Sequence, residues 1–261
     1  MEQSRYYWID SCKTFGLLLV ILGHGRLFPE TNQQFIYSFH MPLFFVLSGL
    51  LYKYKSPKET FLHDVKRLLI PYLIINFICL AIQCGLLLIQ GELTVAELWH
   101  RVIGVFCVAC YSGAYPPASV PTWFIIALFF VRMLLSMRDS KCYRIGLTLF
   151  SVIVFLIIKY YTLDPWLPID TALMAIPFMF FGIALKPLKD YKFNKSSLLV
   201  LCLPALMIIL LVITNTYNGL VDMSWCSYGN SLTVFYLNGL LGTLALLVFS
   251  RLIPVVGGGI L

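Results

Sequence analysis

Long apolar runs dominate this chain of 261 residues and limit what it can fold into. A helix that crosses the hydrocarbon core of a bilayer needs about 20 residues, and its backbone must form all its own hydrogen bonds. Runs of nearly that length occur at 14–28, 35–52, 68–89, 123–137, 144–161, 171–186, 197–214 and 230–250. The sequence therefore predicts an all-α, polytopic transmembrane helix bundle in a single domain over residues 1–261.

The charged residues support this fold class and orient the chain. Only 12% of the residues are charged, against about 25% in a typical soluble domain. Most lysines and arginines gather in the segments 53–67, 132–144 and 186–195, while the loops at 162–170 and 215–229 have none. Cytoplasmic loops of membrane proteins are rich in Lys and Arg, so the N-terminus is predicted to be cytoplasmic. The net charge of +7 is thus a topology signal, and we expect no nucleic-acid partner.

Three further patterns carry less information. Residues 101–112 form an apolar run too short to span, which we expect to be re-entrant or interfacial. "CVAC" at 107–110 has CxxC spacing, but it is a lone pair in an apolar segment, so we predict neither a metal nor a redox site. The N-terminus has no small-residue cleavage site, so 14–28 is interpreted as a retained first span rather than a signal peptide.

Ionisable residues flank the first apolar run in "IDSCKTFGLLLVILGHGRLF", 9–28. Lys13 and His24 are eleven positions apart, which puts them within about 20° of one helix face and about 16 Å apart along the axis. Asp10 lies three residues before Lys13 and is expected to pair with it. Arg26 falls on a different face and receives no role. One stripe therefore predicts a paired cation near the cytoplasmic end and an imidazole near the outer end.

A second imidazole, His40, lies near the outer end of the next run, "FIYSFHMPLFFVLSGLLY", 35–52. Because consecutive spans are antiparallel, His24 and His40 are expected at a similar depth. Ionisable groups inside membrane segments usually face cavities or partners, and imidazole, with a reference pKa of about 6.5, suits proton transfer. The alternatives are an interfacial, hydrated histidine and a Lys13 that snorkels to the surface. The stripe favours a large anionic donor reaching up from the cytoplasm.

These segments closely resemble the membrane acyltransferase-3 family. The resemblance rests on the lysine and histidine of 9–25, on "FHMPLFFVLSGLLY" (39–52) and on "KRLLIPYL" (66–73), with weaker agreement at 121–130, 169–183 and 228–246. It implies a bundle of about ten helices, so we expect 8–10 membrane helices in this chain. It also implies transfer of an acyl group, usually acetyl, from cytoplasmic acyl-CoA to a carbohydrate hydroxyl on the outer side, as in bacterial members that O-acetylate surface or secreted sugars.

The resemblance also assigns roles to residues. His24 matches the histidine regarded as catalytic, and His40 matches the histidine of the second helix. Lys13 matches a basic residue linked to donor binding, while Lys66 and Arg67 match a basic pair suited to CoA phosphates. The positive-inside rule alone also explains this pair. Trp123 and Phe124 match a tryptophan–aromatic pair that lines the site.

The sequence thus predicts a multi-pass O-acyltransferase of the bacterial inner membrane. His24 is expected to be the general base, His40 to orient the reactants or steady the developing charge, and Asp10 to hold Lys13. No metal and no permanently bound cofactor are expected; acetyl-CoA is the donor, and the partners are membrane lipid and a carbohydrate or glycolipid acceptor. A covalent acyl-histidine relay stays open beside direct transfer. Family members usually continue with another helix beyond "IPVVGGGIL", so we expect either a C-terminally truncated chain or a short member of the family.

Two rival functions remain. A transporter or channel for a small solute would use the same stripe as a proton or substrate path, although internal repeats, its usual mark, are not evident. An inactive, truncated acyltransferase is the second rival.

Overall fold

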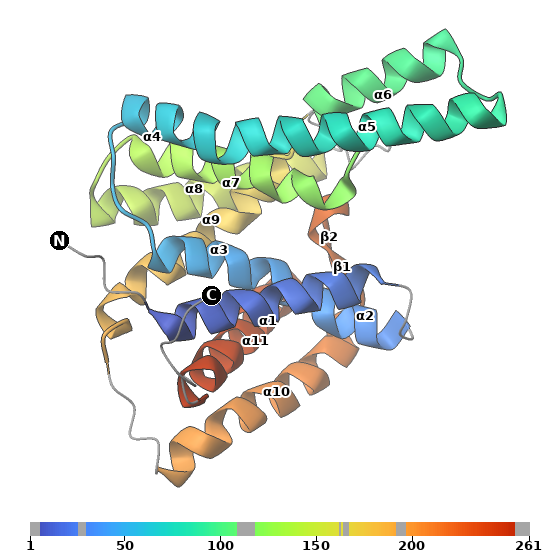
Figure 1. Ribbon diagram of the computed structural model, residues 1–261. Helices are drawn as coiled ribbons and strands as arrows, with labels where there is room; N and C mark the ends of the chain where they lie inside the picture. Colours follow the sequence, from blue (N-terminus) through green and yellow to red (C-terminus); the bar gives the residue numbers. More distant parts are fainter. Residues whose placement is uncertain are drawn as a thin grey trace. The chain divides into compact units, whose positions relative to one another are not determined.

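The computed structural model is built almost entirely from helices (Figure 1). It describes residues 6–25, 30–108, 118–161, 163, 167–191 and 197–253. Four of the described helical segments are long and apolar enough to cross a membrane, and two shorter apolar helices accompany them. The predicted all-α helical membrane fold is confirmed. The four long segments are Pro57–Gln90, Lys141–Tyr160, Val200–Asn218 and Leu232–Leu252.

The chain divides into two compact units, each described here by itself. The first unit consists of Met1–Tyr52, Phe181–Asp222 and Ser227–Leu261, and the second of Lys53–Phe180 and Met223–Cys226. Helix α9, Ile169–Ala184, runs from the second unit into the first. The first unit otherwise contains α1 (Tyr7–His24), α2 (Glu30–Tyr37), α3 (His40–Leu50), η3 (Lys186–Leu188), α10 (Leu198–Asn218), β1 (Val221–Asp222), β2 (Ser227–Tyr228) and α11 (Leu232–Leu252).

In the first unit, α1 and α3 pack against each other and against α11, and α10 packs along α11. Two glycines allow the closest approaches. A Cβ atom on Gly182 would lie 2.1 Å from the carbonyl oxygen of Val46, and one on Gly242 would lie 2.2 Å from the ring of Phe39. Small residues at helix contacts are the usual device for close packing in membranes, where there is little hydrophobic force between helices. In the core of this unit, glycines therefore let neighbouring helices approach each other closely.

The predicted single helix over 35–52 is wrong, because the chain breaks between α2 and α3 at Ser38 and Phe39. Pro42 explains the break: it has no N–H to donate to the carbonyl of Ser38, and its ring would clash with that carbonyl in a continuous helix. Ser38 instead turns its own hydroxyl back to the carbonyl oxygen of Phe35, at 2.7 Å. The break makes His40 the first residue of a new helix.

Helices of the second unit begin with a cap and continue for 34 residues from Pro57 to Gln90. Ser56 accepts from the N–H of Glu59, whose carboxylate accepts in return from the N–H of Ser56. The predicted span at 68–89 therefore starts earlier. The elements are α4 (Pro57–Asp64), the π-helical η1 (Val65–Leu69), α5 (Ile70–Gln90), α6 (Val95–Cys107), η2 (Val120–Thr122), α7 (Trp123–Ser136), α8 (Lys141–Tyr160) and η4 (Met223–Trp225).

Candidate active site

The ionisable stripe lies along α1, and the predicted pair of Asp10 and Lys13 forms. The ammonium of Lys13 donates to the carboxylate of Asp10 at 3.3 Å, one turn back on the same helix. Both side chains are exposed to a similar degree, so neither is locked inside the unit. Arg26 and the second cysteine of the CxxC pair, Cys110, lie outside the described residues. The pair leaves a cation accessible at the start of the helix.

His24 is the last residue of α1, and its exposed imidazole lies beside Tyr37. Nδ1 of His24 is 3.3 Å from the Tyr37 hydroxyl, and the ring centroids are 5.8 Å apart. The tyrosine ring also neighbours His40, with centroids 5.0 Å apart. Both imidazoles therefore lie beside one tyrosine, Tyr37, which the sequence reasoning missed.

Gln33 fixes the position of this tyrosine. Its side-chain amide nitrogen donates to the Tyr37 hydroxyl at 3.3 Å and to the carbonyl oxygen of Gly23 at 2.9 Å. That carbonyl is among the last four of α1, which lack a partner within the helix. Gln33 and Tyr37 are four residues apart on α2, a spacing that places side chains on one face. The spacing of Gln33, Tyr37 and the following His40 was the signal available in the sequence.

His40 is buried, with 4% of its surface exposed, at the N-terminus of α3. Its Nδ1 lies 2.9 Å from the carbonyl oxygen of Ile36. In an unbroken helix this carbonyl would accept from the backbone N–H of residue 40. At the helix break it accepts instead from the imidazole and from the backbone N–H of Phe39, the latter at 3.3 Å. Because a carbonyl can only accept, Nδ1 of His40 carries a proton.

Buried amides accompany the histidines in the first unit. Asn238 of α11 is fully buried, and its Oδ1 accepts from the Thr214 hydroxyl of α10 at 2.5 Å. Gln34 of α2 donates to the backbone carbonyl of Asn215 at 3.4 Å. Among the described residues, Nδ2 of Asn238 and Oδ1 of Asn215 find no protein partner. Buried polar atoms are almost always satisfied, so water or a polar ligand is expected at both.

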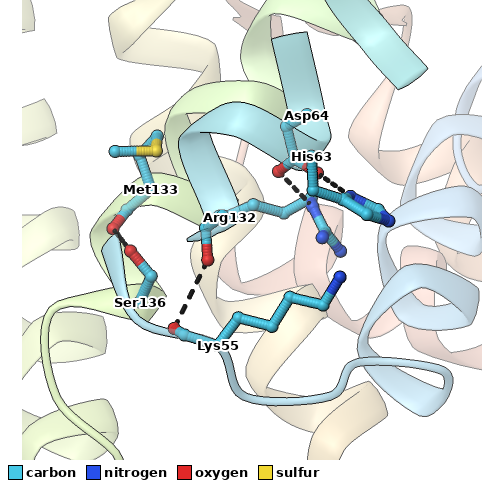
Figure 2. A network of polar contacts seen from close by, with 7 residues as sticks. Lys55, His63, Asp64, Arg132, Met133 and Ser136 are labelled. Atoms are coloured by element: carbon cyan, nitrogen blue, oxygen red, sulfur yellow. Dashed lines mark hydrogen bonds and ion pairs between the residues drawn. The ribbon is translucent and has the colours of Figure 1, made fainter. Parts of the chain in front are cut away.

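The predicted basic pair, Lys66 and Arg67, lies in the second unit on the π-helical η1. Asp64, the residue that precedes η1, is buried and accepts two charge-assisted hydrogen bonds (Figure 2). Nε of Arg132 donates to one carboxylate oxygen at 2.6 Å, and Nδ1 of His63 to the other at 2.8 Å. This cluster ties α4 to α7 and holds the start of the π-helical turn. Nothing in the sequence reasoning indicated it.

Trp123 and Phe124 open helix α7, also in the second unit. Trp123 is buried, and the two rings meet edge to face with centroids 6.2 Å apart. The preceding Thr122 donates its hydroxyl to the carbonyl of Ser119 and accepts from the side-chain amide of Asn76 at 3.0 Å. These contacts fix the turn from which α7 starts. The aromatic pair therefore has a defined geometry, with a polar neighbour at its base.

Comparison with known proteins places the chain in a protein family. A family model described as an acyltransferase domain matches residues 6–255. No curated protein and no solved structure matches the chain significantly. The match includes most of the first unit, all of the second unit and every residue assigned to the candidate site.

Proposed function

Since the chain belongs to the acyltransferase-3 family and carries helices able to cross a membrane, it is a membrane acyltransferase, and we propose that it O-acetylates a carbohydrate. The acyl group is acetyl, the donor is cytoplasmic acetyl-CoA, and the acceptor is a hydroxyl of a carbohydrate or glycolipid at the outer face. No cofactor stays permanently bound. This proposal rests on the family and on the chemistry of the side chains that the fold gathers.

The grouping of His24, Tyr37 and His40 carries the proposal. O-acylation requires a base that takes the proton of the acceptor hydroxyl as its oxygen attacks the thioester carbonyl carbon. The C–S bond then breaks, and the thiolate of CoA takes up a proton, which yields an ester and a free thiol. Imidazole can both accept and return this proton near neutral pH. The sequence favours His24 as the base, with His40 orienting the reactants or stabilising the developing charge.

The donor's anionic end requires cations away from the histidines. Lys13 lies about 16 Å from His24 by helical rise, a distance over which an extended donor can separate its phosphates from its thioester. Lys66 and Arg67 are proposed to bind CoA phosphates as well, since Arg offers two parallel N–H groups to phosphate oxygens. Trp123 and Phe124 are proposed to contact the acceptor, because aromatic faces suit the apolar faces of sugars.

The bacterial inner membrane and a cytoplasmic N-terminus complete the proposal. The basic segments at 53–67, 132–144 and 186–195 then all lie on the cytoplasmic side, where Lys- and Arg-rich loops are found. This orientation places Lys13 near the compartment that contains acetyl-CoA and His24 near the outer surface.

Transfer of labelled acetyl from acetyl-CoA in membranes that express the chain tests the proposal, with free thiol measured in the same sample. With the wild-type chain, we expect label in a carbohydrate fraction and an equal amount of free thiol. Both products should be lost in His24→Ala. Both should be kept in the control His100→Ala, because His100 is an exposed histidine on α6, outside the candidate site. A transporter would release no thiol, so the absence of thiol with the wild-type chain would contradict the proposal. Unchanged transfer by His24→Ala would remove His24 from the chemistry.

A further inference from the structure

The hydrogen bonds of the two histidines give them opposite roles. We infer that His40 Nε2 accepts the acceptor's proton, whereas His24 Nε2–H donates a hydrogen bond to the thioester oxygen, and that Tyr37 imposes this difference. The inference rests on the proposed acyl transfer and deepens it by dividing the labour within the pair. It reverses the division that the sequence favours.

His40 has only one arrangement of protons in its neutral form. Its Nδ1 lies 2.9 Å from the carbonyl oxygen of Ile36, which can only accept, so the single proton of the neutral ring sits on Nδ1. Nε2 therefore carries a bare lone pair. Within the described part of the chain, no side chain or backbone group bonds this nitrogen. His40 can thus accept a proton without any change of tautomer.

The opposite polarity at His24 follows from Gln33. The carbonyl of Gly23 accepts from the Gln33 amide at 2.9 Å, so the nitrogen of this amide, and not its oxygen, faces α1. The same nitrogen lies 3.3 Å from the Tyr37 hydroxyl oxygen, which must accept from it. The hydroxyl still has its own proton to donate, and we assign this proton to Nδ1 of His24, also at 3.3 Å. Nδ1 of His24 thereby accepts, and the proton of its neutral ring sits on Nε2.

Packing holds Tyr37 in this place. Its ring lies against Gly23, where an added Cβ atom would come within 2.9 Å of the ring carbon Cε1. The ring of His40 lies tilted against the same tyrosine, with the ring centroids 5.0 Å apart. The hydroxyl therefore cannot leave His24 without moving both the end of α1 and the start of α3. Tyr37 is a positioning residue that acts through His24.

The reaction balances with these roles. His40 Nε2 takes the proton of the acceptor hydroxyl while its oxygen forms a bond to the thioester carbon. The carbonyl oxygen gains negative charge and accepts the hydrogen bond from His24 Nε2–H, a role equivalent to an oxyanion hole. As the C–S bond breaks, the imidazolium of His40 returns the proton to the thiolate sulfur. Both histidines finish as they began, and the products are the ester and CoA thiol.

Glutamine separates the two roles, because its side-chain amide can donate a hydrogen bond but cannot accept a proton at neutral pH. We expect His24→Ala to lower kcat by about 100-fold or more and His24→Gln to recover at least tenfold of that loss. His40→Gln is expected to be as inactive as His40→Ala, since loss of a general base removes about 100- to 10,000-fold. A His24→Gln no better than His24→Ala, or a His40→Gln tenfold better than His40→Ala, would overturn the inference.

Nitrogen-15 spectra of histidine-labelled protein in detergent provide a test that needs no activity. With signals assigned through the His24 and His40 variants, we expect the neutral rings to be protonated on Nε2 at His24 and on Nδ1 at His40. Tyr37→Phe should shift His24 toward a mixture of tautomers and leave His40 unchanged, whereas Tyr217→Phe, an exposed tyrosine on α10, should alter neither. An Nδ1-protonated His24 in the wild type would refute the division of roles even if acyl transfer is confirmed.

Discussion

The Lys13–Asp10 pair illustrates how little an exposed ion pair has to do with folding and how much it can do for binding. Both side chains lie at the surface of α1, about 40% exposed or more, where such pairs contribute below about 1 kcal/mol to stability. The carboxylate therefore orients the ammonium of Lys13 but leaves it able to bind an anion. A phosphate group of the donor can bind the ammonium together with the Asp10 carboxylate, or can displace that carboxylate.

Lys13→Ala should consequently raise the KM for acetyl-CoA by about tenfold or more, because a charge-assisted hydrogen bond contributes about 1.5–3 kcal/mol. Lys13→Arg should stay close to the wild type, and Asp10→Asn should change KM by no more than about threefold. Initial rates at varied acetyl-CoA concentration measure this. An unchanged KM in Lys13→Ala would show that the donor's phosphates bind elsewhere.

The carboxylate of Asp64 presents the opposite case, since it is only 1% exposed and accepts from both Arg132 and His63. Removal of one partner from a buried pair leaves an uncompensated charge and destabilises by about 3–5 kcal/mol. Asp64→Ala should therefore lower the thermal midpoint in detergent markedly, and adding Arg132→Met should restore part of the loss. The pair of Asp139 with Arg144 is the matched control, because its arginine is about as buried as Arg132 whereas the Asp139 carboxylate is 51% exposed.

For that control, Asp139→Ala is expected to change stability by less than about 1 kcal/mol. Equal effects of Asp64→Ala and Asp139→Ala would contradict the view that burial makes the Asp64 cluster essential. The comparison is informative because both carboxylates pair with an arginine of the second unit, so that burial is the main difference between them.

At the scale of helices, close packing in the first unit depends on Gly182. A methyl group there would lie 2.1 Å from the Val46 carbonyl oxygen, a backbone atom that cannot turn away. Gly182→Ala must therefore push α9 away from α3 and should reduce folded yield and thermal stability strongly. Gly146 on α8 is the control, because a Cβ atom added there meets nothing within 4 Å. Gly146→Ala should be neutral or slightly stabilising, since the helix propensity of Ala is more favourable than that of Gly by about 1 kcal/mol. Similar melting of the two variants would refute this account of the contact.

The helices themselves followed from the sequence, because apolar runs of membrane length have few alternatives to a helix. The break between α2 and α3 did not, since Pro42 permits either a kink or a new helix start, and the choice depends on the turn at Ser38 and Phe39. The same break determines which residues come together in the candidate site. His24 and His40 were predicted from their chemistry, but Gln33 and Tyr37 are ordinary helix residues until the turn brings them to the end of α1.

Residues far apart in sequence were the hardest to predict. The cluster of Asp64 with Arg132 joins residues 68 positions apart, and no helical periodicity links them. Lys66 and Arg67 were found because they stand beside each other in a basic segment, whereas no local pattern marks Asp64, only two residues away, as a buried carboxylate. Burial of a carboxylate depends on the neighbouring helix α7, which local sequence patterns do not specify.

For the whole molecule, the decisive prediction is the topology, which depends on whether α6 crosses the membrane. With 13 residues, α6 is about 20 Å long, well short of the roughly 30 Å of hydrocarbon. We therefore expect α6 to stay on the outer side, which places the connection after α7 in the cytoplasm with most of the basic residues. Fusions of alkaline phosphatase after Ser56 and after Asp139 should then be inactive, and a fusion after Gly219 should be active. Fluorescent-protein fusions at the same three positions should give the reverse pattern.

Two outcomes would contradict this topology. An active phosphatase after Asp139 would mean that α6 crosses the membrane. An active phosphatase after Ser56 would mean that the N-terminus lies outside, which would separate Lys13 from the compartment of its proposed donor.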